Sequence, residues 1–146
     1  LLLFAVLFTF KKTFIRRVFH LLLMDAPLPS KTVIGLHEQV TINGHPTIAK
    51  IDTGASISSI DLELATKLHL GPLVARKVII TAHGKRMRPV IKTPVVIGGR
   101  KINASFTIIT RSHMKYKVLI GLNVLKKNFL IDPMMPPPPH RAHGEI

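Results

Sequence analysis

The chain contains no cysteine, and only 7 of its 146 residues are acidic. Without cysteine it has no disulfide framework, no thiol nucleophile and no cysteine-ligated zinc site. The absence also fits a reducing compartment, so we expect a cytoplasmic protein. The sequence has neither a His-Glu-x-x-His motif nor a Gly-x-x-x-x-Gly-Lys phosphate loop, and its histidines are scattered. It therefore predicts no metal site and no bound cofactor.

The shortage of acidic residues leaves the chain strongly basic. Its formal net charge is +14, and residues 31–132 alone hold 16 Lys and Arg against 5 Asp and Glu, a net charge of +11. Such a field attracts nucleic acid, anionic lipid or acidic peptides, although an ordinary solvated basic surface is a competing interpretation. Only 5% of the residues are aromatic. This argues against a nucleic-acid-binding barrel, because such barrels present aromatic rings for base stacking.

Both ends of the chain are predicted to lie outside a single folded domain. The first ten residues are apolar but too few to span a bilayer, and basic residues follow them up to Arg17. This order is the reverse of a signal peptide and fits the cytoplasmic flank of a membrane helix beginning before Leu1. A cytoplasmic appendage and a membrane anchor through residues 1–23 therefore stay open as interpretations of residues 1–30. Proline-rich residues 133–146 are predicted to form a disordered tail.

The residues between these ends, 31–132, have the pattern of β-strands. Asn43-Gly44 and Gly98-Gly99 each separate two apolar runs, which is the sequence signature of a β-hairpin. A third hairpin is predicted around "HGKR", with Gly84 at its tip. Near the end of the domain, residues 102–108 alternate between apolar and polar side chains, the period of a half-buried strand.

Two short helices are expected to interrupt the strands. Ser58 and Asp61 have the spacing of a capping box, and an apolar stripe follows from Ile60 to Leu68. Gly71-Pro72 is expected to end this helix. The second helix, Leu122–Asn128, follows directly after the apolar run "VLIG". The sequence therefore predicts an all-β domain with two short helices.

The stretch "AKIDTGASISS" contains the motif most suggestive of chemistry. Asp52-Thr53-Gly54 follows an apolar strand, a glycine-containing hairpin comes later, and Gly121 ends a hydrophobic-hydrophobic-Gly segment 69 residues beyond Asp52. This joint pattern resembles the retropepsin-like aspartic proteases. The resemblance implies a single-lobe acid-protease barrel whose Asp-Thr-Gly loop carries the catalytic aspartate and whose hairpin is the flap. It also implies that the segment ending in Gly121 braces the catalytic loop.

A narrower resemblance extends over residues 31–133. The segments "KTVIGLHEQVTI", "AKIDTGASISSID" and "RSHMKYKVLIGLNVLKKNFLIDP" are similar to the family found with RimK/LysX-type ATP-grasp ligases, often labelled ATP-dependent zinc proteases. This implies a functional association with such a ligase, which would have to supply any ATP dependence. Many bacterial members carry a basic residue where this chain has Ser56, so their subsite preference does not transfer.

Peptide hydrolysis by this route uses two carboxylates that share one proton. The chain has one Asp-Thr-Gly, so a C2 homodimer is needed to bring two Asp52 side chains together. The resemblance implies that Thr53 forms hydrogen bonds across the dimer axis and that Gly54 permits the tight turn. The residues that it assigns to the substrate groove and to the flap are Ala55, Ser56, His83, Gly84, Lys85 and Arg86.

Three functions are consistent with these features. We expect a homodimeric aspartic endopeptidase that acts on acidic, glutamate-rich peptides or protein tails. The second interpretation is a retropepsin-fold binding or dimerisation module without catalysis, and the third is a basic barrel that binds nucleic acid. Asp52 alone is also compatible with a plain turn, and the flap cations with an ordinary solvated hairpin.

Overall fold

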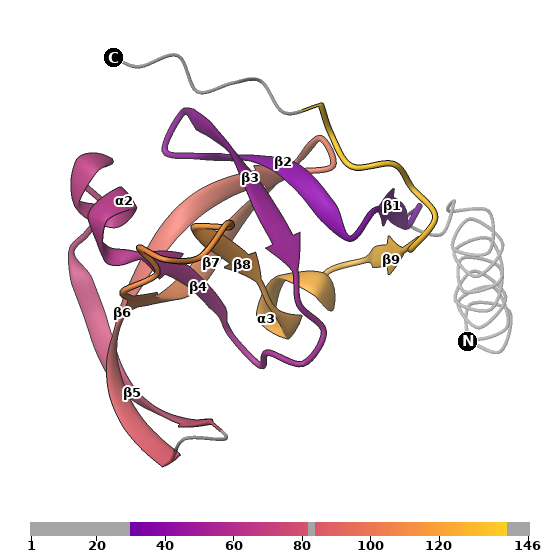
Figure 1. Cartoon of the computed structure of the whole chain (residues 1–146). Helices are drawn as coiled ribbons and strands as arrows, with labels where there is room; N and C mark the ends of the chain where they lie inside the picture. The colour runs from indigo at the N-terminus through magenta and orange to yellow at the C-terminus, as the bar shows by residue number, and fades with distance from the viewer. Residues whose placement is uncertain (1–29, 82–83, 140–146) are drawn as a thin grey trace, which may run out of the picture. The chain divides into compact units, whose positions relative to one another are not determined.

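The computed structural model describes residues 30–81 and 84–139, and the predictions made for residues 1–29, for His83 and for residues 140–146 lie outside this part (Figure 1). The fold belongs to the second of two compact units, Lys31–Ile146. Its elements are strands joined mostly by short turns, with two short helices. The domain boundaries proposed from the sequence stay a prediction.

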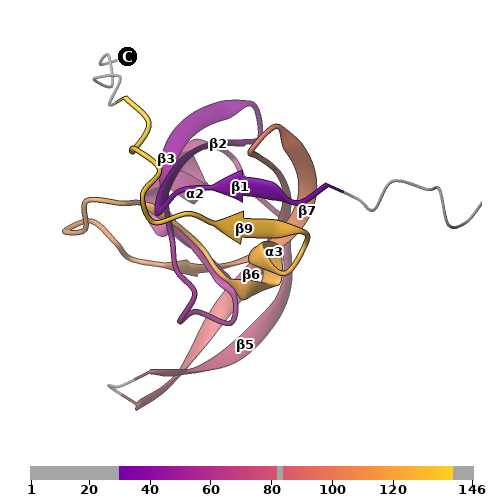
Figure 2. The same ribbon diagram turned by 90° about the vertical axis from the view of Figure 1, so that its right-hand side faces the viewer.

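Six strands close into a β-barrel. In the order in which they pair, they are β2 (His37–Ile42), β3 (His45–Ile51), β8 (Val118–Ile120), β4 (Ser58–Asp61), β7 (Arg100–Ile109) and β6 (Gly84–Ile97). Pairing between β2 and β6 closes the ring. The strand β5 (Leu73–Thr81) pairs with β6, and the two extend away from the barrel as a long hairpin (Figure 1, Figure 2). The predicted all-β, retropepsin-like barrel is therefore confirmed.

A separate two-stranded sheet lies at the side of the barrel. It joins β1 (Thr32–Ile34) to β9 (Phe129–Ile131) in parallel (Figure 2). Segments from both ends of the domain thus lie side by side. Val33 and Leu130 remain 47% exposed on this small sheet.

The core fills the barrel because its long strands alternate. In β6 the residues from Ile91 to Ile97 are buried at every second position, and in β7 Ile102, Ala104 and Phe106 are buried. The alternation predicted for residues 102–108 holds from Ile102 to Phe106, whereas Thr107 is buried and Ile108 is only half-buried. Removing each large side chain of this kind from water contributes about 1.5–3 kcal/mol, so the barrel supplies most of the apolar burial that positions its loops.

The predicted glycine turns are confirmed, with one correction. Asn43 and Gly44 have φ values of 48° and 82°, and Gly98 and Gly99 have 53° and 74°, so both turns use the left-handed region that suits tight hairpins. In the β5–β6 hairpin, Gly84 is not in a four-residue loop. It pairs with Thr81, and Lys85 and Arg86 continue the ladder.

The first helix differs from its prediction. Ser58–Asp61 is the strand β4 because it pairs with both β7 and β8 inside the barrel, and this pairing overrides the local capping pattern. The helix α2 (Leu62–Lys67) begins after it and ends before Gly71-Pro72, and Asp61 makes no side-chain cap. The second helix, α3 (Leu122–Leu125), is also shorter than predicted. In the part of the chain that the structure describes, no helix is both long and apolar enough to cross a membrane.

Candidate active site

Asp52 lies in a loop that directly follows β3. Its backbone N–H donates to the carbonyl of Ile120 in β8 at 2.9 Å. Its carboxylate oxygen Oδ1 accepts the N–H of Gly54 at 3.0 Å, and its carbonyl accepts the N–H of Ala55 at 3.3 Å. The Asp52 side chain is half-buried, whereas Thr53 and Gly54 are exposed. The loop therefore holds one carboxylate in a fixed orientation at the barrel surface.

Gly121 braces this loop by close backbone contact. The N–H of Leu122 donates to the carbonyl of Ala55 at 2.8 Å. A Cβ atom on Gly121 would lie 2.8 Å from that carbonyl oxygen and 2.8 Å from the carbonyl carbon of Ile57. Real Cβ atoms do not approach backbone atoms so closely, so only glycine fits. The bracing role that the resemblance implied for the segment ending in Gly121 is present in the structure.

A polar network that the sequence reading missed supports the same loop. Asn123 Oδ1 accepts both the backbone N–H and the hydroxyl of Ser58, each at 2.8 Å. The Ser58 hydroxyl oxygen in turn accepts the N–H of Gly121 at 3.0 Å, and Asn123 Nδ2 donates to Ser105 at 2.8 Å. Its signal in the sequence is Ser58, six positions after Asp52, whose spacing to Asp61 instead predicts a helix cap.

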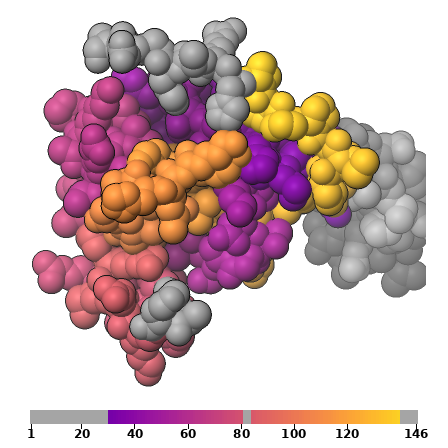
Figure 3. Space-filling model, in the orientation of Figure 1, coloured from indigo at the N-terminus to yellow at the C-terminus, as the bar shows by residue number. Residues whose placement is uncertain are grey.

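The residues predicted to bind substrate lie on two elements. Ala55 is half-buried and Ser56 is exposed in the loop after Asp52, while Gly84, Lys85 and Arg86 are exposed on the hairpin. Both views place this loop and the hairpin at the same end of the barrel, and the hairpin protrudes from the molecular surface (Figure 1, Figure 2, Figure 3). Their roles stay predictions.

Alternation along the hairpin separates its cations into two faces. Cross-strand partners share a face, and successive residues point to opposite sides. The pairs Lys77–Arg88 and Ile79–Arg86 therefore share one face, whereas Ile80–Lys85 lies on the other. The two adjacent cations of the predicted flap, Lys85 and Arg86, thus cannot both face the same groove.

Arg111 is a buried cation whose charge acts on the site, and no local pattern in the sequence predicts it. Its side chain extends from the segment after β7, where its backbone N–H donates to the buried carboxylate of Asp61. Burial is the largest influence on the pKa of Arg111 and lowers it below its usual value; Asp61 and then Asp52 oppose this shift, and Arg88 adds to it. Arg111 is therefore within electrostatic range of both Asp52 and the hairpin.

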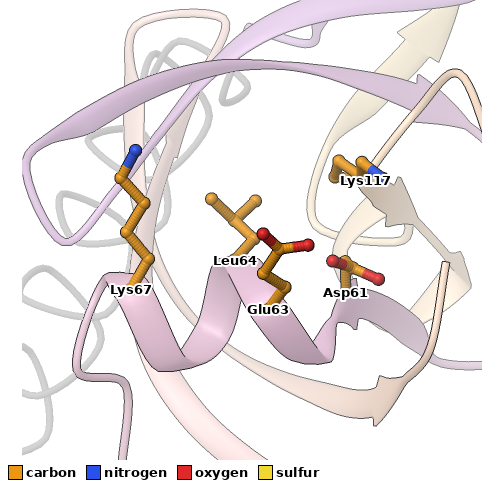
Figure 4. Close-up of a pocket in the computed structure, with 5 residues that line it drawn as sticks. All are labelled: Asp61, Glu63, Leu64, Lys67 and Lys117. Atoms are coloured by element: carbon orange, nitrogen blue, oxygen red, sulfur yellow. The ribbon is translucent and has the colours of Figure 1, made fainter. Parts of the chain in front are cut away.

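A pocket on another part of the surface does not include Asp52. It lies beside α2 and is lined by Asp61, Glu63, Leu64, Lys67 and Lys117 (Figure 4). The Lys117 ammonium donates to the carbonyls of Arg111 and Ser112 at 3.1 and 2.9 Å. Lys117 thus ties the 111–117 segment together. Among the residues the structure describes, no group of three potential metal ligands lies close enough to hold an ion.

A known protein family matches most of the barrel, including the loop that carries Asp52. The family model described as "gag-polyprotein putative aspartyl protease" matches residues 38–127, which is more than half of the chain and includes Asp52 and Gly121. No curated protein matches the chain.

Solved structures resemble the chain at low sequence identity. The crystal structure of a Legionella pneumophila protein of unknown function (DUF785) has a TM-score of 0.53 and 19% identity, covering 74% of this chain and 98% of that one. The solution structure of a simian foamy virus protease has a TM-score of 0.49 and 20% identity, covering 62% of this chain and 91% of that one. The Legionella similarity concerns the fold alone. The family match, together with the retropepsin-like barrel, shows that this chain belongs to the gag-polyprotein aspartyl protease family.

Proposed function

We propose that the chain is an aspartic endopeptidase that works as a homodimer, with Asp52 of each subunit forming half of the catalytic pair. The observation that carries the proposal is the bracing of one half-buried carboxylate by Gly54, Ile120 and the Gly121 segment. In the reaction one carboxylate takes a proton from water, which attacks the peptide carbonyl carbon, while the other gives its proton to the carbonyl oxygen. The C–N bond then breaks as a proton reaches the amine nitrogen.

The dimer is supported by the positions of the other acidic side chains. Asp61 is buried and accepts the N–H of Arg111, and Asp132 accepts the N–H of Met134 beyond β9. Glu38 accepts the N–H of Gly35, and Glu63 is exposed on α2. None of these shares a hydrogen bond with Asp52 in the described residues, so the second carboxylate is expected from a second copy.

Thr53 suits a position at the subunit boundary. It is exposed next to Asp52, and within the described residues its hydroxyl has no hydrogen-bond partner. A hydroxyl both donates and accepts, so two Thr53 side chains related by a two-fold axis can satisfy each other. Ala55 and Ser56 then border the groove, and the β5–β6 hairpin covers it.

Mixing wild-type and Asp52→Asn subunits tests the shared site. If each active site needs two Asp52 side chains, hydrolysis scales with the square of the wild-type fraction. After subunit exchange, an equal mixture should then keep about a quarter of the activity per total protein, because mixed dimers are inactive. Analytical ultracentrifugation of the same samples should show a dimer. Activity that falls linearly with the wild-type fraction, or a strict monomer that cleaves peptides, would contradict the proposal.

We further infer that the substrates are acidic peptides or protein tails. The net charge of +11 over residues 31–132 supports this, as does the pair Arg86 and Arg88 on one face of the hairpin. Clustered cations attract acidic chains and disfavour basic ones. The segments that resemble the RimK/LysX-associated group make an ATP-grasp ligase the expected functional associate, and a glutamate-rich tail the expected substrate.

The substrate class is tested by salt and by charge reversal. Cleavage of oligoglutamate-containing peptides should weaken as salt rises, because the screening length falls from about 10 Å at 0.1 M to about 3 Å at 1 M. Arg86→Glu should raise KM for these peptides more than for neutral ones, and more than Lys85→Glu does, since the two residues lie on opposite faces. If neutral apolar peptides are cut faster at every salt concentration, the acidic class is wrong.

A further inference from the structure

Arg111 is a buried cation whose guanidinium forms no direct ion pair within the described residues. Its side chain is only 8% exposed. The guanidinium donates through Nε to the carbonyl of Tyr116 at 3.0 Å and through Nη1 to the hydroxyl of Ser59 at 3.5 Å. No carboxylate among the described residues lies within ion-pair distance of it. Buried arginines are normally paired, because an uncompensated charge is costly to remove from water.

One end of the guanidinium is open. Every fully enclosed polar side-chain atom in the described residues has a hydrogen-bond partner. Nη2 of Arg111 has none, so it is not fully enclosed. An arginine with two nitrogens anchored and one nitrogen open is preorganised to receive a planar acceptor such as a carboxylate.

The position of Arg111 places this open end near the catalytic loop. Its partner Ser59 pairs with Leu119 across the β4–β8 ladder. The next residue of β8, Ile120, accepts the backbone N–H of Asp52. The guanidinium is thus linked to the catalytic carboxylate through neighbouring strand positions, and the two charges act on one another electrostatically.

The hairpin contributes a second cation to the same region. Arg88 is half-buried in the part of β6 that pairs with β5, and its charge acts on Arg111. It shares its face of the hairpin with Arg86. Arg76 lies on the same hairpin but on the opposite face, opposite Pro89.

We propose that Arg111, assisted by Arg88, is a specificity-determining residue that binds an acidic substrate side chain at one position beside the scissile bond. This rests on the peptidase function proposed above and adds to it a position-specific requirement, distinct from general attraction of acidic chains. The substrate carboxylate supplies the direct ion-pair partner that the Arg111 guanidinium lacks within the described residues, where Asp61 and Asp52 act on it only from beyond ion-pair distance. The alternative is that Arg111 only anchors the 111–117 segment through Tyr116 and Asp61.

Paired peptides separate these roles. Peptides that differ only by Glu or Gln at one position, scanned across several positions on both sides of the cleaved bond, are compared by kcat/KM with the full chain. The wild-type protein should prefer Glu about 10- to 100-fold at one position, the range expected for a hydrogen bond to a charged group. Arg111→Gln should abolish this preference by slowing only the Glu peptide. Arg111→Lys should restore part of it, and Arg76→Gln should leave it unchanged.

The outcomes distinguish failure of this inference from failure of the peptidase proposal. Equal cleavage of Glu and Gln peptides at every position overturns the role of Arg111 while the peptidase stands. An equal loss on both peptides in a folded Arg111→Gln protein means that Arg111 only anchors the loop. If Arg111→Gln does not fold, Arg111→Lys and Arg88→Gln carry the test. If no peptide is cleaved, calorimetric binding of the Glu and Gln peptides to the full chain decides, since a preference for Glu in binding needs no hydrolysis.

Discussion

Replacement of Asp52 by asparagine is expected to lower kcat/KM for peptide hydrolysis by about 10³-fold or more without unfolding the protein. Proton transfer by a positioned group contributes roughly 10²- to 10⁴-fold to a rate, and asparagine cannot accept the proton from water. In the wild-type protein the Gly54 N–H donates to Asp52 Oδ1 at 3.0 Å, and the asparagine amide keeps an Oδ1 that can accept the same bond. The loop therefore stays in place while its chemistry is lost.

The measurement is the rate of peptide cleavage, with the folded state followed by circular dichroism and sedimentation. Wild-type activity should pass through a maximum with pH, because one carboxyl of the pair must be ionised and the other protonated. Asp132→Asn is the matched control. Its carboxylate is exposed and accepts the N–H of Met134, so this variant should retain activity. Unchanged activity in Asp52→Asn would rule out the aspartic mechanism, and a wild-type dimer that cleaves nothing would favour a binding module.

Gly121→Ala is expected to destabilise the fold by about 3 kcal/mol or more, at the upper end of the usual range for overpacking. The added Cβ would meet the carbonyl oxygen of Ala55 and the backbone of Ile57 at 2.8 Å. These neighbours are backbone atoms, so they cannot rotate away as a side chain would. Any relaxation must move the segment after Asp52, and activity should fall together with stability.

Urea unfolding monitored at a fixed protein concentration measures this effect, because the proposed dimerisation would link stability to concentration. Gly71→Ala is the control. A Cβ there would meet no atom within 4 Å, and its φ is not in the left-handed region, so the change should cost less than about 1 kcal/mol. A fully stable and active Gly121→Ala protein would show that the catalytic loop does not depend on this close contact.

Local sequence patterns predict those features that depend on the conformational preferences of neighbouring residues. Asn43-Gly44 and Gly98-Gly99 predict their turns because few other residues tolerate positive φ at consecutive positions. The alternation of apolar residues in β7 predicts its buried face because successive side chains of a strand point to opposite faces. Asp52-Thr53-Gly54 and Gly121 are far apart in sequence, so no local pattern relates them. The family resemblance predicted that the two segments lie together.

Ser58–Asp61 shows where local patterns fail. The spacing of Ser58 and Asp61 suits a helix cap, yet strand pairing on both sides draws the segment into the barrel. Ser58 then becomes a partner of Asn123, and Asp61 a partner of Arg111. Both contacts join residues at least 50 positions apart, so no local rule predicts them.

The sequence by itself determined the Asp-Thr-Gly motif, the hairpins and the basic charge, since these follow from residue type and short-range geometry. Only the tertiary structure decided which cations lie near Asp52. Lys85 and Arg86 are neighbours in sequence, but the pleat of β6 turns them to opposite faces. Arg111 is distant in sequence, yet the parallel pairing of β7 with β4 carries it to Ser59 beside the catalytic loop. Charge can be counted from composition, whereas its placement depends on which strands pair.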